Sequence, residues 1–199
     1  MRILAIGGMS SGVGKTTLIC RILPGLPGWG VLKTSVRSGK KAGGDLPPDH
    51  YEIVTAAQDL QVPGKDTGRY HQAGAAGLSW LRTGPDGLAE GVARAMERFS
   101  GYPGVVVEGN SHTFHQEPDR LVLVARGSLS EIKPTAARLL PRADLVVLNQ
   151  ATGEDRGGLT CQALVDAGAG CPILEGDVRS RQVLDRIRNR LATWFPPSP

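Results

Sequence analysis

The chain has 199 residues, a length that suits one α/β domain able to fold without disulfides or structural metals. Its formal net charge of +4 is too small to indicate nucleic-acid binding, and its apolar stretches are too short to cross a membrane. Three cysteines without a C-x-x-C pair give no disulfide framework and indicate reducing cytosol. We therefore expect a cytoplasmic protein that binds neither nucleic acid nor membranes.

The chain opens with an apolar run at 3–6, a glycine-rich segment and a helical pattern at 18–23. A strand, a glycine-rich turn, Gly-Lys-Thr and a helix in this order form the context of a phosphate-binding loop (P-loop). Its N–H groups converge on phosphate oxygens, and the helix start adds partial positive charge. We expect Lys15 to reach the terminal phosphates of GTP or ATP as a catalytic residue, and Thr16 to ligate Mg²⁺. The expected nucleotide-binding residues of this loop are Gly8, Ser11, Gly12, Val13, Gly14, Lys15, Thr16 and Thr17.

The loop departs from the common spacing G-x-x-x-x-G-K-[ST]. Met9 stands where the first glycine is expected and Gly8 lies one residue earlier, so the loop reads G-x₅-G-K-T. This longer loop resembles that of dethiobiotin synthetase and cobyrinic acid synthase. The resemblance implies one alternative function, an ATP-dependent synthetase or ligase that activates a small carboxylate.

Further apolar runs alternate with helical patterns along the rest of the chain. This alternation predicts a three-layer α/β fold, a mostly parallel sheet with helices on both faces, as in P-loop NTPases. Ligands would lie beyond the carboxyl ends of the strands. We expect one nucleotide-binding domain at 1–195, a flexible tail at 196–199 and an exposed, mobile loop at 38–48. The expected strands are 30–33, 78–81, 104–107, 121–124, 145–148 and 172–174, and the expected helices are 86–99, 132–140, 159–167 and 180–194.

Two acidic residues are candidate metal ligands. Glu108 ends the apolar strand at 104–107, where P-loop proteins place an acid that holds Mg²⁺ directly or through water, and we also expect it to be catalytic. Asp66 lies in the segment Gly-Lys-Asp-Thr at 64–67 and could be another Mg²⁺ ligand. Alternatively, Asp66 or Thr67 caps a helix. Lys65 and Arg69, on either side of Asp66, could hold a phosphate or a second anionic substrate.

The block G-K-D-T-x-R-x-x-x-A-G-A at 64–75 resembles the B protein of molybdopterin guanine dinucleotide biosynthesis. The order of parts is also similar: a P-loop, a second strand ending in Lys33, this block, and V-x-x-E-G ending after Glu108. That family has histidines after the lysine, whereas this chain has Thr-Ser-Val-Arg at 34–37.

The resemblance implies a Mg²⁺-dependent, GTP-binding accessory protein of molybdenum cofactor maturation with slow NTPase activity. Its partner would be a nucleotidyltransferase or a molybdoenzyme, and a homodimer is compatible with this reading. In this family Thr16, Asp66 and Glu108 would surround the metal. A further alternative is a nucleotide-gated chaperone or metallocentre assembly factor whose output is partner binding.

The remaining candidates carry two interpretations each. Lys33 could approach phosphate or a second substrate, or be a strand-end surface lysine. Asn149 ends the strand at 145–148 and could pair with a purine edge, or cap a turn, because the guanine-reading N-K-x-D is absent. His112 and His115 could bind a metal or an anion, but we expect solvated loop histidines.

Overall fold

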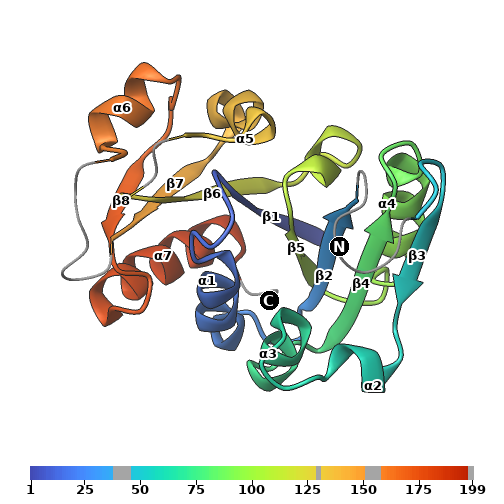
Figure 1. Cartoon of the computed structure of the whole chain (residues 1–199). Helices are drawn as coiled ribbons and strands as arrows, with labels where there is room; N and C mark the ends of the chain where they lie inside the picture. Colours follow the sequence, from blue (N-terminus) through green and yellow to red (C-terminus); the bar gives the residue numbers. More distant parts are fainter. Residues whose placement is uncertain (38–45, 129–130, 151–157, 197–199) are drawn as a thin grey trace.

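Helices cover both faces of one eight-stranded sheet in the computed structural model (Figure 1). The structure describes residues 1–37, 46–128, 131–150 and 158–196. The strands are β1 (Arg2–Gly8), β2 (Gly30–Val36), β3 (Tyr51–Val54), β4 (Gly77–Thr83), β5 (Gly104–Glu108), β6 (Arg120–Arg126), β7 (Leu145–Asn149) and β8 (Ile173–Gly176). The helices are α1 (Lys15–Ile22), α2 (Ala57–Leu60), α3 (Asp66–Gln72), α4 (Leu88–Glu97), α5 (Pro134–Leu139), α6 (Cys161–Asp166) and α7 (Arg181–Trp194), with 3₁₀ turns η1 (Leu23–Gly25), η2 (Ser111–Phe114) and η3 (Leu140–Arg142).

The sheet has the strand order β3-β4-β2-β5-β1-β6-β7-β8. Every neighbouring pair is parallel except β3 and β4. The predicted mostly parallel sheet with helices on both faces is therefore confirmed, and each predicted strand and helix is present with shifted ends. The short antiparallel edge strand β3 was not predicted.

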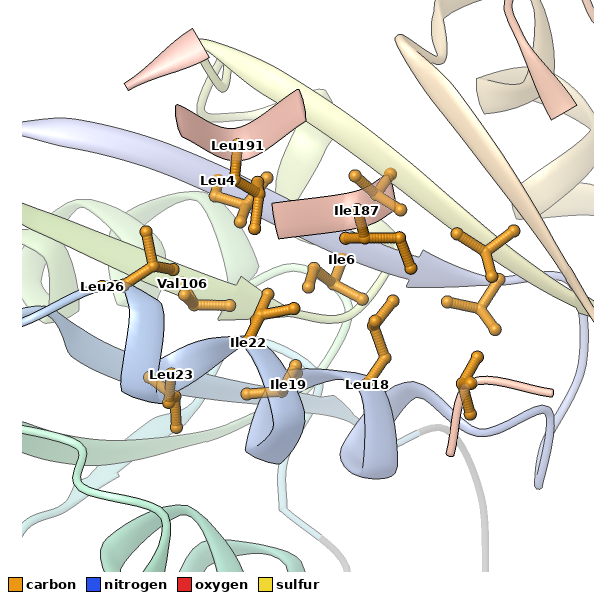
Figure 2. Close-up of a cluster of buried hydrophobic side chains, with 14 of the residues drawn as sticks. Leu4, Ile6, Leu18, Ile19, Ile22, Leu23, Leu26, Val106, Ile187 and Leu191 are labelled. Atoms are coloured by element: carbon orange, nitrogen blue, oxygen red, sulfur yellow. The ribbon is translucent and has the colours of Figure 1, made fainter. Parts of the chain in front are cut away.

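One face of the sheet packs against α1 and α7 (Figure 1). The alternate residues Leu4 and Ile6 of β1 point to this face and meet Leu18 and Ile22 of α1 and Ile187 of α7 (Figure 2). Each is at most 2% exposed, and burial of such a side chain stabilises a fold by about 1.5–3 kcal/mol. An aliphatic cluster between α1 and the sheet therefore fixes the helix that follows the phosphate loop.

The opposite face is covered in two patches. Beside β2, β4 and β5, helix α4 packs its buried residues against Leu32, Leu81 and Val105. Beside β6 and β7, helices α5 and α6 pack against alternate residues such as Leu123 and Val146. Strands buried on both faces explain why the sequence shows continuous rather than alternating apolar runs.

Strand register sets the site. In the central strands, Ile6 of β1 lies level with Glu108 of β5, and Lys33 of β2 lies level with the same Glu108. Because parallel strands end at one edge, the P-loop after β1, the lysine and the carboxylate come together there.

Two sequence predictions fall partly outside the described residues. The predicted mobile loop at 38–48 overlaps 38–45, and the predicted tail overlaps 197–199, neither of which is described. At the described end of the loop, the backbone N–H groups of Asp86 and Gly87 donate to the carbonyl of Pro48. Among the described helices, none combines the length and apolar character needed to cross a membrane.

Candidate functional site

The P-loop connects β1 to α1. Gly14 precedes the helix with φ 106°, a left-handed conformation that favours glycine, and a Cβ there would lie 2.6 Å from Nδ2 of Asn149. A left-handed residue followed by helical ones turns successive N–H groups toward one point, which is the geometry of an anion-binding nest. The loop therefore presents backbone donors at the first turn of α1.

The extra residue of the loop is absorbed by the sheet. Met9 is fully buried, and its N–H donates to the carbonyl of Val124 in β6 at 2.9 Å, as if β1 continued by one residue. Gly8 leaves room for Lys15, because a Cβ at Gly8 would lie 2.9 Å from Cδ of that lysine. The unusual spacing thus lengthens the strand and leaves the turn before α1 intact.

Thr16 and Asp66 lie side by side at the starts of α1 and α3. The Thr16 hydroxyl donates to Oδ1 of Asp66 at 3.0 Å, and the Lys33 ammonium donates to Oδ2. Partial burial opposes ionisation of Asp66, but the hydrogen bonds and charge of Lys33 and the Thr16 bond outweigh it, so its pKa is lowered. The Asp66 carboxylate is therefore ionised at neutral pH and faces the phosphate loop.

The helix-cap interpretation of Asp66 and Thr67 is wrong. Lys65 occupies the N-cap position of α3, Asp66 is the first helical residue, and no side chain caps the helix. The reason is that the Asp66 carboxylate is turned toward Thr16 and Lys33 instead of its own backbone.

Glu108 is the buried carboxylate of the site, with 6% of its surface exposed. Tyr70 donates to Oε2 of Glu108 at 2.7 Å, Lys33 lies 3.9 Å from the same oxygen, and Lys15 lies 3.8 Å from Oε1. Burial, followed by the charge of Glu108, raises the pKa of Tyr70, so the phenol keeps its proton. A buried charge is tolerated here because it is paired and hydrogen-bonded.

These groups fit a Mg²⁺ ion by their chemistry. Mg²⁺ prefers oxygen ligands and is usually held by one or two carboxylates together with substrate phosphates and water. Thr16, Asp66 and Glu108 supply one hydroxyl and two carboxylates, and Lys33 places a positive charge between the two acids. The described part of the chain has no group of three or more His, Cys, Asp or Glu residues that could hold a metal ion.

The other predicted binding residues have different positions. Nη2 of Arg69 lies 3.3 Å from Oγ1 of Thr17, beside the first turn of α1. Lys33 is not a surface lysine, because its side chain is 19% exposed and contacts Asp66. A cavity of about 330 Å³ is lined by Lys33 and by the Gly64–Thr67 segment.

Asn149 braces the P-loop. Its Nδ2 donates to the carbonyl of Val13 at 2.9 Å, and its Oδ1 accepts from the N–H of Val178 at 3.1 Å. The structure thus uses both polar ends of the amide on backbone groups. The purine contact stays a prediction.

The expectation that both histidines are solvated is wrong for His112. Its imidazole in η2 is fully buried, and neither ring nitrogen finds a hydrogen-bond partner among the described residues. Burial lowers the pKa of His112 to about 3, so the ring is neutral. The sequence does not predict the burial of His112, because most residues around it are polar.

Several site residues were missed from the sequence. Asn110 receives the N–H of Gly8 at 2.8 Å and donates to its carbonyl at 3.0 Å, which ties the ends of β5 and β1 together. Thr34 donates to the carbonyl of Glu108 at 2.8 Å, and a Cβ at Gly109 would lie 2.1 Å from its hydroxyl oxygen. One signal could have identified Asn110, namely its position two residues after the end of the buried strand β5.

Beyond Lys15, the strand ends enclose a polar cavity of about 380 Å³. Its lining includes Lys15, Lys33 and Glu108, together with Lys133 and Thr135 at the start of α5. Ser35 also lines it and accepts a hydrogen bond from Nε1 of Trp80 at 2.9 Å.

Comparison with known proteins shows the fold. No protein-family model and no curated protein sequence matches the chain. HypB from Helicobacter pylori, solved in complex with nickel, is similar with a TM-score of 0.63 and 14% identity over 97% of this chain and 86% of HypB. The hydrogenase maturation factor HypB from Archaeoglobus fulgidus has a TM-score of 0.61 and 16% identity, over 98% and 90% of the two chains. LpxK from Aquifex aeolicus, solved with ATP, has a TM-score of 0.50 and 17% identity, over 88% of this chain and 53% of LpxK. With the P-loop in place, the chain has the P-loop NTPase fold.

Proposed function

We propose that this chain is a Mg²⁺-dependent P-loop NTPase that binds GTP or ATP, hydrolyses it slowly, and serves as an accessory protein in molybdenum cofactor maturation. The observation that carries the nucleotide-binding part is the gathering of Lys15, Thr16, Asp66 and Glu108 at one sheet edge, within reach of a loop that presents backbone donors.

The residues have separable roles in this proposal. The backbone of the P-loop and the Lys15 ammonium bind the phosphates, and Arg69 adds positive charge beside Thr17. Thr16 and Asp66 would hold Mg²⁺, with Glu108 behind them. The bound ion would neutralise charge on the terminal phosphates.

Glu108 would hold the attacking water in this proposal. Its carboxylate lies within 4 Å of Lys15 and Lys33 and accepts a hydrogen bond from Tyr70, so these contacts fix its position. A side chain fixed in this way would orient a water molecule toward the terminal phosphate, and we expect hydrolysis to be slow.

The accessory role rests on the Gly-Lys-Asp-Thr block at 64–67 and its surroundings, which resemble the molybdopterin guanine dinucleotide protein B family. The structural similarity to a hydrogenase maturation factor favours the broader class of nucleotide-dependent maturation proteins, including metallocentre assembly. In this class the nucleotide state controls contact with a protein partner.

A second candidate is a synthetase that activates a small carboxylate with ATP. One observation favours it: the polar cavity of about 380 Å³ next to Lys15, which could seat a small substrate beside the terminal phosphate. In the synthetase the small molecule, and not a protein, would complete the site.

Calorimetry with GTP and ATP, with and without Mg²⁺, tests the proposal. Lys15→Ala should weaken triphosphate binding about 30-fold or more, because a charged contact worth at least about 2 kcal/mol is lost. Asp66→Asn should remove most of the Mg²⁺-dependent part of the affinity. Arg98→Ala, a control that removes a positive charge from an exposed residue at the end of α4, should change little. Unchanged affinity in Lys15→Ala would contradict nucleotide binding at this loop.

A further inference from the structure

The polar cavity beyond Lys15 shares Gly8, Ser11, Lys15 and Lys33 with the expected nucleotide site and extends past it to Lys133 and Thr135. It meets the P-loop at Gly8, Ser10, Ser11 and Lys15, whereas the residues from Gly12 to Gly14 and the two threonines of α1 do not line it. The cavity therefore lies on the far side of the Lys15 side chain from the helix start. A triphosphate bound at the nest would present its last phosphate toward this space.

The charge of the cavity is positive. Three lysines line it, Lys15, Lys33 and Lys133, and the one carboxylate among its lining residues is that of Glu108. Glu108 lies within 4 Å of Lys15 and Lys33, and Lys33 also pairs with Asp66 just outside the cavity. These two carboxylates leave the charge of Lys133 as the surplus, and an anion would offset it.

Lys133 is held in place by the P-loop. Its Nζ donates to Oγ of Ser11 at 3.1 Å, and its backbone N–H donates to the carbonyl of Met9 at 2.9 Å. The ammonium has three protons, so the bond to Ser11 leaves donors for a ligand. The two contacts limit the entropy that would be lost when Lys133 binds one.

Thr135 is oriented in a similar way. Its hydroxyl oxygen accepts from Nδ2 of Asn110 at 3.2 Å, and Asn110 is itself fixed to both backbone groups of Gly8. Because the oxygen faces Asn110, the hydroxyl proton points away from it and is available to an acceptor. The cavity wall thus offers cationic and hydroxyl donors from α5 opposite those of β2.

The size and polarity limit the ligand. A volume of about 380 Å³ is near the lower end for ligand pockets, which run from roughly 300 to 1,000 Å³. Its other lining groups are mainly serine and threonine hydroxyls, with Val36 at the margin. A second nucleotide base or a hydrophobic acid would find few apolar contacts here.

We propose that this cavity binds a small, hydrophilic oxyanion, a phosphate or a short polycarboxylate, beside the terminal phosphate of the bound nucleotide. Lys133 and Thr135 recognise it, and Lys15 and Lys33 are shared between it and the nucleotide. The proposal rests on the proposed function for the position of the nucleotide, and it identifies the class of the second ligand.

The test is calorimetric titration of inorganic phosphate and, separately, of succinate into protein saturated with Mg²⁺ and a non-hydrolysable ATP analogue. We expect one of the two anions to bind. Lys133→Ala should weaken that anion about tenfold or more, because a charge-assisted hydrogen bond is lost, and Thr135→Val should weaken it by about three- to tenfold. Lys133→Gln, which removes the charge but keeps most of the side chain, should show the same loss if the alanine variant folds poorly.

Lys65→Ala is the matched control. It removes the same charge from an exposed lysine that lines the neighbouring cavity and not this one, so anion affinity should stay within about twofold. All variants should keep the ATP-analogue affinity of the unmodified protein within about threefold. Preference for succinate supports a carboxylate ligand, and preference for phosphate supports a phosphoryl ligand.

Two results would overturn the inference while leaving nucleotide binding intact. One is no binding of either anion to the nucleotide-loaded protein; the other is equal weakening by Lys133→Ala and Lys65→Ala. If the unmodified protein bound no nucleotide, the proposed function would fail instead. The same titrations on nucleotide-free protein would then decide the cavity: dependence on Lys133 supports it, and dependence on Lys15 alone refutes it.

Discussion

The two sides of helix α1 differ sharply in chemistry. Its buried side carries Leu18, Ile19 and Ile22, which are at most 1% exposed and pack against β1, β5 and α7 (Figure 2). Its first turn carries Lys15 and Thr16, whose side chains lie against the carboxylates of Glu108 and Asp66. The buried side makes many weak, non-directional van der Waals contacts, whereas the first turn makes a few directional hydrogen bonds and ion pairs.

The contrast separates stability from function. Directed polar contacts contribute little net stability, because each replaces a contact with water, whereas apolar burial supplies most of it. The buried aliphatic side of α1 therefore fixes the helix, and this holds the polar side chains of its first turn in a defined geometry. Substitutions on the two sides should produce different kinds of loss.

The largest effect is expected on the apolar side. Ile19→Ala should lower the free energy of unfolding by about 2–5 kcal/mol, because a fully buried side chain is replaced by a cavity. Urea denaturation followed by circular dichroism measures it. Arg21→Ala on the exposed side of the same helix is the control and should cost under about 1 kcal/mol. A similar cost for both variants would remove the distinction between the two sides.

A smaller loss is expected where a polar contact is buried. Tyr70→Phe removes the donor to Glu108, and a hydrogen bond to a buried charge contributes about 1.5–3 kcal/mol. Tyr51→Phe is the matched control, since it removes a 3.1 Å hydrogen bond to Glu90 at the surface, and should cost less than about 1 kcal/mol. Both are measured by urea denaturation at pH 7. Equal costs would mean that burial of Glu108 does not strengthen the contact.

At neutral pH the mildest effect concerns His112, because its contribution is lost only as the pH falls. Its folded pKa of about 3 lies below the ordinary value of 6.5, so the unfolded chain takes up a proton that the folded protein excludes. Stability from this residue is therefore complete above pH 6.5 and falls by up to about 1.4 kcal/mol per pH unit as the pH drops toward 3. His112→Leu should remove this slope between pH 6.5 and 5, measured by thermal or urea unfolding at each pH.

His115→Leu provides the comparison for that experiment, since His115 is exposed. It should leave the pH slope of the unmodified protein unchanged. A slope retained in His112→Leu would mean that another titrating group, and not the buried imidazole of His112, causes it.

The sequence predicted the fold well because its strands are buried on both faces. Continuous runs such as 104–107 and 145–148 can hardly be placed anywhere except inside a parallel sheet. Strand β3 escaped because it is short, antiparallel and at the sheet edge, where Glu52 faces solvent and no apolar run is needed. The position of β3 at the edge of the sheet, and not any unusual residue, therefore explains why the sequence pattern did not predict it.

The site was predictable only where a motif fixes a local structure. Lys15 and Thr16 follow from the P-loop, and Glu108 from its place at a strand end. Tyr70 could not be assigned, because its role depends on the angle at which α3 meets β5. Lys133 follows a strand and a turn with no motif, and its contact with Ser11 spans 122 residues of sequence.

The hydrogen bond from Trp80 to Ser35 has an optical consequence. The indole of Trp80 donates to Ser35, which lines the cavity, and Trp80 itself lines the neighbouring cavity with Lys33 and Asp66. The other two tryptophans, Trp29 and Trp194, pack with Phe195 and Arg120, away from these groups. The intrinsic fluorescence of this protein therefore contains one emitter coupled to the site and two that serve as an internal reference. Replacing Trp29 and Trp194 by phenylalanine would leave Trp80 as the single tryptophan, whose emission follows events at Ser35 without an added label.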